Sequence, residues 1–230
     1  MIVYYAAIDN QFVDQPEKAY KDAIIANNYQ NLEREVSFLR CPAIRDYYKN
    51  TFVIKSNCDF SFTINKEANE VRTHEYDDDF YDRALLIRSI SHRIVTIKLP
   101  NLIFFADKPV IAEQIPAAFH KNGLNDVSLF CGAFDVGRHF RRLEAAFAAN
   151  RDMTISIEEG KPLYYLRFLT DEKIEFRQFR YTEKISSFQN MFKVQRDHTK
   201  KITPLNWYYE RFGKSGLRKK LLAELEKEAF

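Results

Sequence analysis

The stretch that decides the fold is TISIEEGKPLYYLRFLTDEKIEFRQF, residues 154–179. Aromatic and β-branched residues dominate its apolar runs, as is typical of strands. Glycine, proline and aspartate gather between the runs, where they favour turns. We therefore expect three consecutive strands paired as a meander, at 154–157, 163–168 and 174–179, with turns at 159–162 and 170–172.

Other runs with the residue types typical of strands lie upstream of this stretch. Residues 60–64, FSFTI, alternate strictly between apolar and polar side chains, which predicts a strand with one buried face. Pro100 and Asn101 separate two apolar runs and predict a hairpin between them. Turn residues at 55–59 join two other runs. Upstream strands are thus expected at 2–8, 51–54, 60–64, 94–99 and 102–105.

Helical patterns occupy the two ends of the chain. Pro16 and the pair Asn27-Asn28 have the character of helix start and stop signals. In the last segment, leucines at 217, 221, 222 and 225 fall on one stripe, opposite a charged face. We expect helices at 16–28, 29–39, 183–194, 204–212 and 217–229.

These elements predict an α+β fold with an antiparallel β-sandwich or jelly-roll-like core and helices at the N- and C-terminal ends. The length of 230 residues fits one domain, 1–230. We place its β-rich core at about 50–180 and its C-terminal helical segment at about 182–230.

Composition excludes several classes of protein. With 46% apolar and 29% charged residues the chain is globular in character, and its six glycines leave little material for a phosphate-binding loop. Neither a signal peptide nor a membrane-spanning run is evident, so we expect a soluble protein that is not secreted by a signal peptide and has no membrane partner. Cys41, Cys58 and Cys131 form no C-x-x-C pair, which fits a reducing compartment.

Catalytic and cofactor motifs are missing from the sequence. There is no G-x-S-x-G, no S-x-x-K and no dinucleotide or P-loop fingerprint, and the five histidines form no H-x-H pair. We therefore expect no cofactor, no metal site and no catalytic residues, and the chain leans away from being an enzyme.

The segment FDVGRHFRR, residues 134–142, is the best candidate site. Its guanidinium groups could bind a phosphate or carboxylate through planar, bidentate hydrogen bonds. The structural alternative, which we favour, has the apolar residues in the core and the arginine stems covering its edge. The candidate residues for binding an anion or a partner are Asp135, Arg138, His139, Arg141 and Arg142.

The acidic cluster HEYDDDFYD, residues 74–82, could attract a divalent cation because oxygen ligands suit such ions. Its spacing does not match the calcium-binding loop pattern, and it contains no glycine. We favour an exposed acidic loop without a metal.

Positive charge is concentrated late in the chain. Residues 1–136 carry a net charge of −4, whereas 137–230 carry +7 and interleave arginine with aromatic residues, as in WYYERF at 207–212. Such interleaving is found where single-stranded nucleic acid is bound. Strand alternation, with aromatic side chains inside and arginines outside, gives the same pattern and is favoured.

Three stretches together resemble a known group of proteins. They are CPA at 41–43 with KNTFVIKS at 49–56, FDVGRHFRR at 134–142, and GKPLYYLRF at 160–168. In this order they resemble a family of uncharacterised proteins of tailed bacteriophages, particularly T4-like and marine phages. The resemblance spans roughly residues 41–180 and implies a phage origin and a jelly-roll-like core. It implies no activity and no site residues.

The leading functional hypothesis is a non-enzymatic bacteriophage protein that acts through protein–protein contacts, as a virion structural component or an accessory factor. Its partner would be another protein or a second copy, in the host cytoplasm or the virion. One alternative is a small-molecule or metal-dependent enzyme on a β-sandwich, with Arg138, His139, Arg141 and Arg142 around an anionic substrate. A second is single-stranded nucleic-acid binding through the basic C-terminal half.

Overall fold

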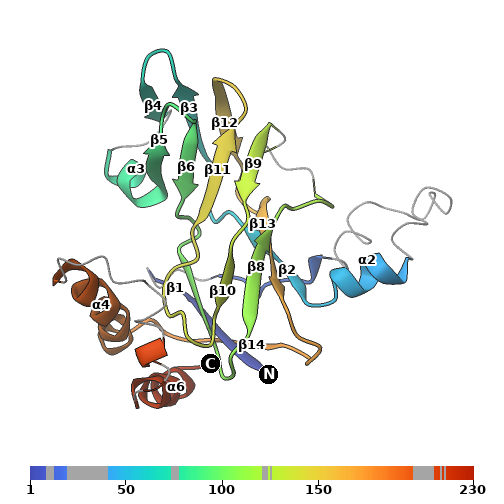
Figure 1. Ribbon diagram of the computed structural model, residues 1–230, viewed down its shortest axis with the longest axis vertical. Coiled ribbons are helices and arrows are strands. Elements are labelled where there is room, and N and C mark those ends of the chain that lie inside the picture. The colour runs from blue at the N-terminus through green and yellow to red at the C-terminus, as the bar shows by residue number, and fades with distance from the viewer. Residues whose placement is uncertain are drawn as a thin grey trace.

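A computed structural model describes residues 1–8, 13–19, 41–73, 78–120, 124, 126–198, 210–212, 214 and 216–230 (Figure 1). Its strands are β1 (Ile2–Ala7), β2 (Thr51–Lys55), β3 (Phe60–Asn65), β4 (Glu70–Thr73), β5 (Leu85–Ser89), β6 (Ile94–Ile97), β7 (Leu102–Ala106), β8 (Ile111–Ile115), β9 (Val127–Phe130), β10 (Ala133–Asp135), β11 (Ala145–Ala149), β12 (Met153–Ile157), β13 (Pro162–Phe168) and β14 (Glu175–Gln178). Its helices are α2 (Pro42–Tyr47), α3 (Asp78–Ala84), α4 (Glu183–His198) and α6 (Leu217–Lys227). The described chain is mostly β, in agreement with a β-rich α+β class.

The strands pair in four sheets. Their orders are β14-β1-β7, β10-β8-β13-β2, β5-β6-β11-β9 and β12-β3-β4. Pairing is antiparallel except between β1 and β14, which run parallel from Ile2↔Glu175 to Tyr5↔Gln178. The first strand therefore belongs to a sheet, although it precedes the expected core at 50–180.

One long ribbon connects two of the sheets. The chain from β2 to β3 lies opposite the chain from β12 to β13, with Lys55 paired to Pro162 and Phe60 to Ile157. Between these pairs the ribbon is held by backbone hydrogen bonds from Ser56 N to Lys161 O and from Gly160 N to Ser56 O, both 2.9 Å. Residues 56–59 and 158–161 thus form an elbow rather than two hairpin turns.

The expected pairings of neighbouring strands are wrong. Strands occur at 153–157, 162–168 and 175–178, but they do not form a meander: β12 pairs with β3, β13 lies between β2 and β8, and β14 pairs with β1. The hairpin around Pro100 is also absent, because β6 pairs with β5 and β11 whereas β7 pairs with β1. In both places the chain turns from one sheet into another, and the true partners are distant in sequence.

Two of the expected helices are confirmed. They are α4, for the prediction at 183–194, and α6, for the prediction at 217–229. The predictions at 29–39 and 204–212 lie wholly or almost wholly outside the described residues, and so does most of 16–28. At the start of 16–28, residues 16–18 are not helical, because Val53 N donates to Glu17 O at 2.9 Å and Lys18 forms a bridge with Phe52, whereas Ala19 is helical. The helices α2 and α3 were not predicted.

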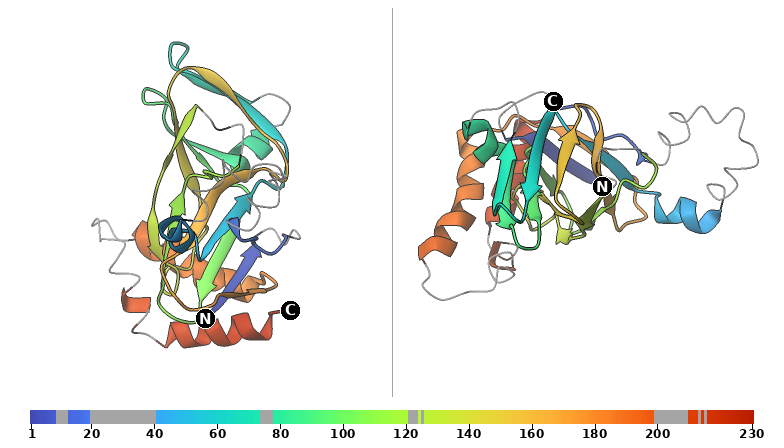
Figure 2. Two further views of the ribbon diagram at one scale, coloured as in Figure 1. Left: turned by 90° about the vertical axis from the view of Figure 1, so that its right-hand side faces the viewer. Right: turned by 90° about the horizontal axis from the view of Figure 1, so that it is seen from above.

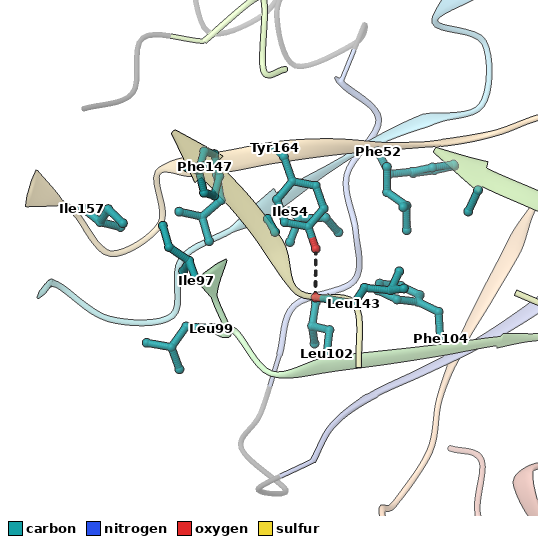
Figure 3. Packing of buried hydrophobic residues seen from close by; sticks show 14 of the residues in the cluster. Phe52, Ile54, Ile97, Leu99, Leu102, Phe104, Leu143, Phe147, Ile157 and Tyr164 are labelled. Carbon is teal, nitrogen blue, oxygen red and sulfur yellow. Dashed lines mark hydrogen bonds between the residues drawn. The ribbon is translucent and has the colours of Figure 1, made fainter. Parts of the chain in front are cut away.

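A large apolar core lies between the sheets. The predicted alternation in β3 is confirmed, since Phe60, Phe62 and Ile64 are buried and their neighbours are not. Figure 3 shows the Tyr164 hydroxyl directed at the Leu143 carbonyl, to which it donates at 3.4 Å. Burial raises the pKa of Tyr164, so this hydroxyl remains a donor at neutral pH.

A second apolar cluster joins the first sheet to the C-terminal helices. Tyr4, Ala6 and Phe105 pack there with the leucine stripe of α6, in which Leu221 and Leu225 are completely buried. The stripe predicted from the sequence is thus confirmed. In the described part of the chain no helix is long and apolar enough to span a membrane.

Candidate functional site

The predicted segment 134–142 begins with a turn organised by Asp135. The Gly137 amide donates to Asp135 Oδ1 at 3.0 Å, and the Asp135 carbonyl accepts from the amides of Arg138 and His139 at 3.0 and 2.7 Å. Arg138 Nε lies 3.2 Å from Asp135 Oδ2. The carboxylate therefore holds the turn and offsets the charge of the nearest arginine.

Close packing holds the same turn from behind. A Cβ at Gly137 would lie 2.5 Å from the Lys108 carbonyl oxygen and 2.7 Å from Pro109 Cα, so only glycine fits. From α6, Arg218 Nε donates to Gly137 O at 2.9 Å, and Arg218 Nη2 donates to Asp107 O at 2.7 Å. Arg218, which the helix pattern places on the charged face, is thus a structural link between α6 and this turn.

His139 is a core residue. Its side chain is buried, and its ring lies 5.3 Å from the ring of Phe134. Burial, assisted by the charge of Arg141, lowers the pKa of His139 to about 3. The imidazole is therefore neutral at physiological pH and adds no positive charge to an anion site.

Arg142 belongs to a different ion-pair group. Its Nη1 donates to Asn101 Oδ1 at 2.9 Å, and its Nε lies 3.7 Å from Glu144 Oε1. Arg88 approaches the same carboxylate at 3.7 Å, and its Nε donates to Thr96 Oγ1 at 2.9 Å. The predicted set is thus divided: Asp135 with Arg138, Arg142 with Glu144, His139 in the core and Arg141 half-buried.

The basic C-terminal half follows the strand interpretation where it is described. Phe168 and Phe179 are buried, as the alternation predicts. Arg167 pairs with Glu113 and lies 3.7 Å from the centre of the Tyr47 ring, while Arg177 lies 2.8 Å from Glu175. Residues 207–209 of the aromatic run lie outside the described chain. Nucleic-acid binding stays an untested prediction.

The acidic cluster is not simply a loop. Residues 74–77 lie outside the described chain, but 78–82 belong to α3, and the Phe80 ring lies 6.3 Å from that of Phe60. The helix has a packing function, which the run of carboxylates concealed. Among the residues that the structure describes, no three His, Cys, Asp or Glu side chains are grouped as metal ligands.

The two sides of the upper sheets differ in charge. Sheets β5-β6-β11-β9 and β12-β3-β4 share one buried core, with β4 and β5 on one side and β9 and β12 on the other (Figures 1 and 2). The edges at β4 and β5, EVRT and LLIRS, carry Glu70, Arg72 and Arg88. Those at β9 and β12, VSLF and MTISI, carry no charged residue.

Strand β9 also borders a sheet face whose aligned positions hold uncharged residues, with Arg88 of β5 donating to Thr96 on that face. The register aligns Leu86, Thr96, Ala146 and Phe130 in one row, and Ser89, Ile94, Ala148 and Ser128 in another. These positions alternate with buried Val95 and Phe147, so they lie on the face turned away from the core. Phe130 is 50% exposed and Leu86 37%. Figure 1 shows no described helix over this face.

An unpaired strand edge is a template for another strand, and proteins usually protect such edges with charges, proline or a covering element. Strand β9 has neither charge nor proline, and in the described chain only β11 pairs with it. We therefore regard Val127–Phe130 and the adjacent face as the candidate interaction site. The sequence prediction missed this strand, although a short uncharged run, VSLF, was its signal.

Comparison of the chain with protein-family models, with curated proteins and with solved structures finds no match.

Proposed function

We propose that this chain is a non-enzymatic protein of a tailed bacteriophage that acts through protein–protein contacts, as a virion structural component or an accessory factor. The phage assignment is supported by the resemblance of residues 41–43 with 49–56, 134–142 and 160–168 to proteins of such phages. Its place of action would be the host cytoplasm or the virion. The contact function is supported by one observation above all: the uncharged edge of β9.

The first partner in this proposal is a second copy of the chain, paired edge to edge through β9. A twofold contact brings the same patch of each copy together, so a charged patch would meet its own charge. Val127–Phe130 avoids that repulsion because all four residues are uncharged. The exposed ring of Phe130 adds apolar area beside the backbone hydrogen bonds.

For the architecture we propose a jelly-roll-like sandwich. Its support is the continuous ribbon from β2–β3 to β12–β13, which would carry strands from one half of a sandwich into the other. This arrangement would leave the edges of β9 and β12 on the same side, where an edge contact could extend both sheets.

Sedimentation velocity of the purified protein, at concentrations up to about 0.2 mM, tests the self-association. We expect a concentration-dependent dimer. Ser128→Lys places a charge on the β9 edge and should raise the dimer dissociation constant at least about tenfold, equivalent to about 1.4 kcal/mol. The matched control is Leu86→Lys, which adds the same charge to the same face on the opposite edge strand, β5.

A strictly monomeric wild-type protein over this range would overturn self-association. Equal effects of Ser128→Lys and Leu86→Lys would overturn the assignment to β9. The phage part has its own test: mass spectrometry of gradient-purified particles of the source virus shows whether the chain is packaged. Detection supports a virion component, whereas its presence only in the infected-cell lysate supports an accessory factor.

A further inference from the structure

The elbow of the long ribbon borders a half-open cavity that the contact function does not use. Its volume is about 210 Å³. Four segments line it: residues 13–17, the end of β2 with Ser56 and Asn57, the link from Pro100 to Leu102, and the turn at 159–160. The cavity is therefore assembled only when distant parts of the chain have come together.

The floor of the cavity is apolar and well supported. Pro16, Val53, Ile54, Pro100 and Leu102 line it, and all five are buried. The turn beside them is held by the hydrogen bond from Gly160 N to Ser56 O and by one from Glu159 N to Asp59 Oδ1 at 2.5 Å. A floor fixed in this way can accept an apolar group without rearrangement of the backbone.

The rim of the cavity is acidic. Among the described residues that line it, three are acidic (Asp14, Glu17 and Glu159) and one is a cation, Lys55. Lys55 Nζ lies 2.6 Å from Glu17 Oε2, so this pair offsets its own charge and leaves an excess of two carboxylates. The negative charge affects two neighbouring groups. Burial and the charge of Asp14 raise the pKa of Tyr5. Burial, Glu159 and Asp59 raise the pKa of Cys58 to about 11.

We propose that this cavity binds a small organic cation, an ammonium or guanidinium group on a short apolar chain. The apolar chain would cover the floor, and the cationic group would lie between Asp14 and Glu159, where charge-assisted hydrogen bonds are strongest. A bare metal ion fits less well, because the apolar floor offers it no ligand. The cavity is smaller than the pockets that hold drug-sized molecules, which limits the ligand to a few non-hydrogen atoms.

The test is a titration of the isotopically labelled protein with n-butylamine, followed by the amide signals of Ser56, Asn57 and Gly160. Saturable shifts of these signals are expected, with weaker binding as salt is raised through the range where screening becomes effective. n-Butanol has the same chain without the charge and should bind at least about tenfold more weakly.

Three variants decide the role of the rim. Asp14→Asn and Glu159→Gln should each raise the dissociation constant for n-butylamine about tenfold, since each removes one charged acceptor. Glu158→Gln is the matched control, because Glu158 is the exposed neighbour of Glu159 and does not line the cavity. It should leave the affinity unchanged. All three residues are exposed, so the folded state should persist, as thermal unfolding would verify.

Three results would overturn the proposal: equal binding of n-butanol and n-butylamine, equal effects of Glu158→Gln and Glu159→Gln, or saturable shifts with magnesium chloride but none with n-butylamine. None of these results depends on self-association, so this proposal and the β9 contact stand or fall separately.

Discussion

Both sides of the upper sheets end in edge strands, but the edge strands of the two sides carry different side chains. On one side, β4 carries Glu70 and Arg72, whose charged groups lie 2.8 Å apart, and β5 carries Arg88. On the other side, β9 and β12 carry none. Protection by charge is common at sheet edges. Within the strands themselves charge occurs on one side only, since Asp126 and Asp152 precede β9 and β12. This difference supports the contact proposed for β9.

The largest effect should come from the core that both sides share. Phe62 is completely buried on β3, the strand between β4 and β12, and Phe62→Ala should lower the free energy of unfolding by about 3–5 kcal/mol. Urea unfolding measures this loss. Phe62→Leu keeps most of the volume and should cost about 1 kcal/mol. Similar losses for the two variants would show that the volume of the Phe62 side chain does not set the stability of this core.

Acidification should weaken the fold itself through His139. The pKa of His139 is about 3 in the folded chain, below its ordinary value of 6.5, so the unfolded chain binds more protons between these values. Stability is therefore lost as pH falls below about 6.5, by about 1 kcal/mol for each pH unit. Urea unfolding of wild type and His139→Phe at several pH values should give curves that diverge below that pH. Parallel curves would refute the assignment. The association measurements on variants of the edge strands should therefore be made near neutral pH.

Removing charge from the protected side should make the two sides more alike. The double variant Glu70→Thr, Arg72→Thr leaves β4 uncharged and, because that ion pair is exposed, should change stability by less than about 1 kcal/mol. Light scattering coupled to gel filtration should detect species larger than the dimer at high concentration. If the double variant associates no further than wild type, charge at β4 is not what protects that side.

The smallest effect concerns the link at the start of β12. Arg93 Nε lies 2.5 Å from Asp152 Oδ1, and this hydrogen bond lowers the pKa of Asp152 below 3.8. The pair therefore stabilises the fold above that pH, and its contribution is lost as pH falls through the lowered pKa. Asp152→Asn should slightly lower the thermal midpoint at neutral pH and have no effect in strong acid. An unchanged midpoint at both pH values would show that the pair contributes nothing.

The sequence predicted the positions of strands and helices better than it predicted which strands pair. Alternation identified Phe60, Phe62 and Ile64 as one buried face because side-chain direction in a strand is a local property. The partner of that strand, β12, lies about 90 residues further along, and no local pattern encodes the pairing. The turn residues at 55–59 and at Pro100 do mark bends, but the hairpin predicted at Pro100 is wrong, because a bend between sheets has the same composition as a hairpin.

The candidate site shows the same division. The pairing of Arg138 with Asp135, three residues apart, lies within reach of the sequence, as does the burial of aromatic side chains beside it. The meeting of Arg88 and Arg142 at Glu144 requires the register of β5, β6 and β11. The edge position of β9 requires the sheet order. Both are properties of the assembled fold.

The parallel pairing of β1 with β14 has a consequence for synthesis of the chain. Glu175 is 173 positions after its partner Ile2, whereas β7, the other neighbour of β1, emerges much earlier. At about 5–20 residues per second, a ribosome needs roughly 10–35 s to cover that distance. During that time β1 can dock only on β7, so the sheet closes after β14 has left the exit tunnel.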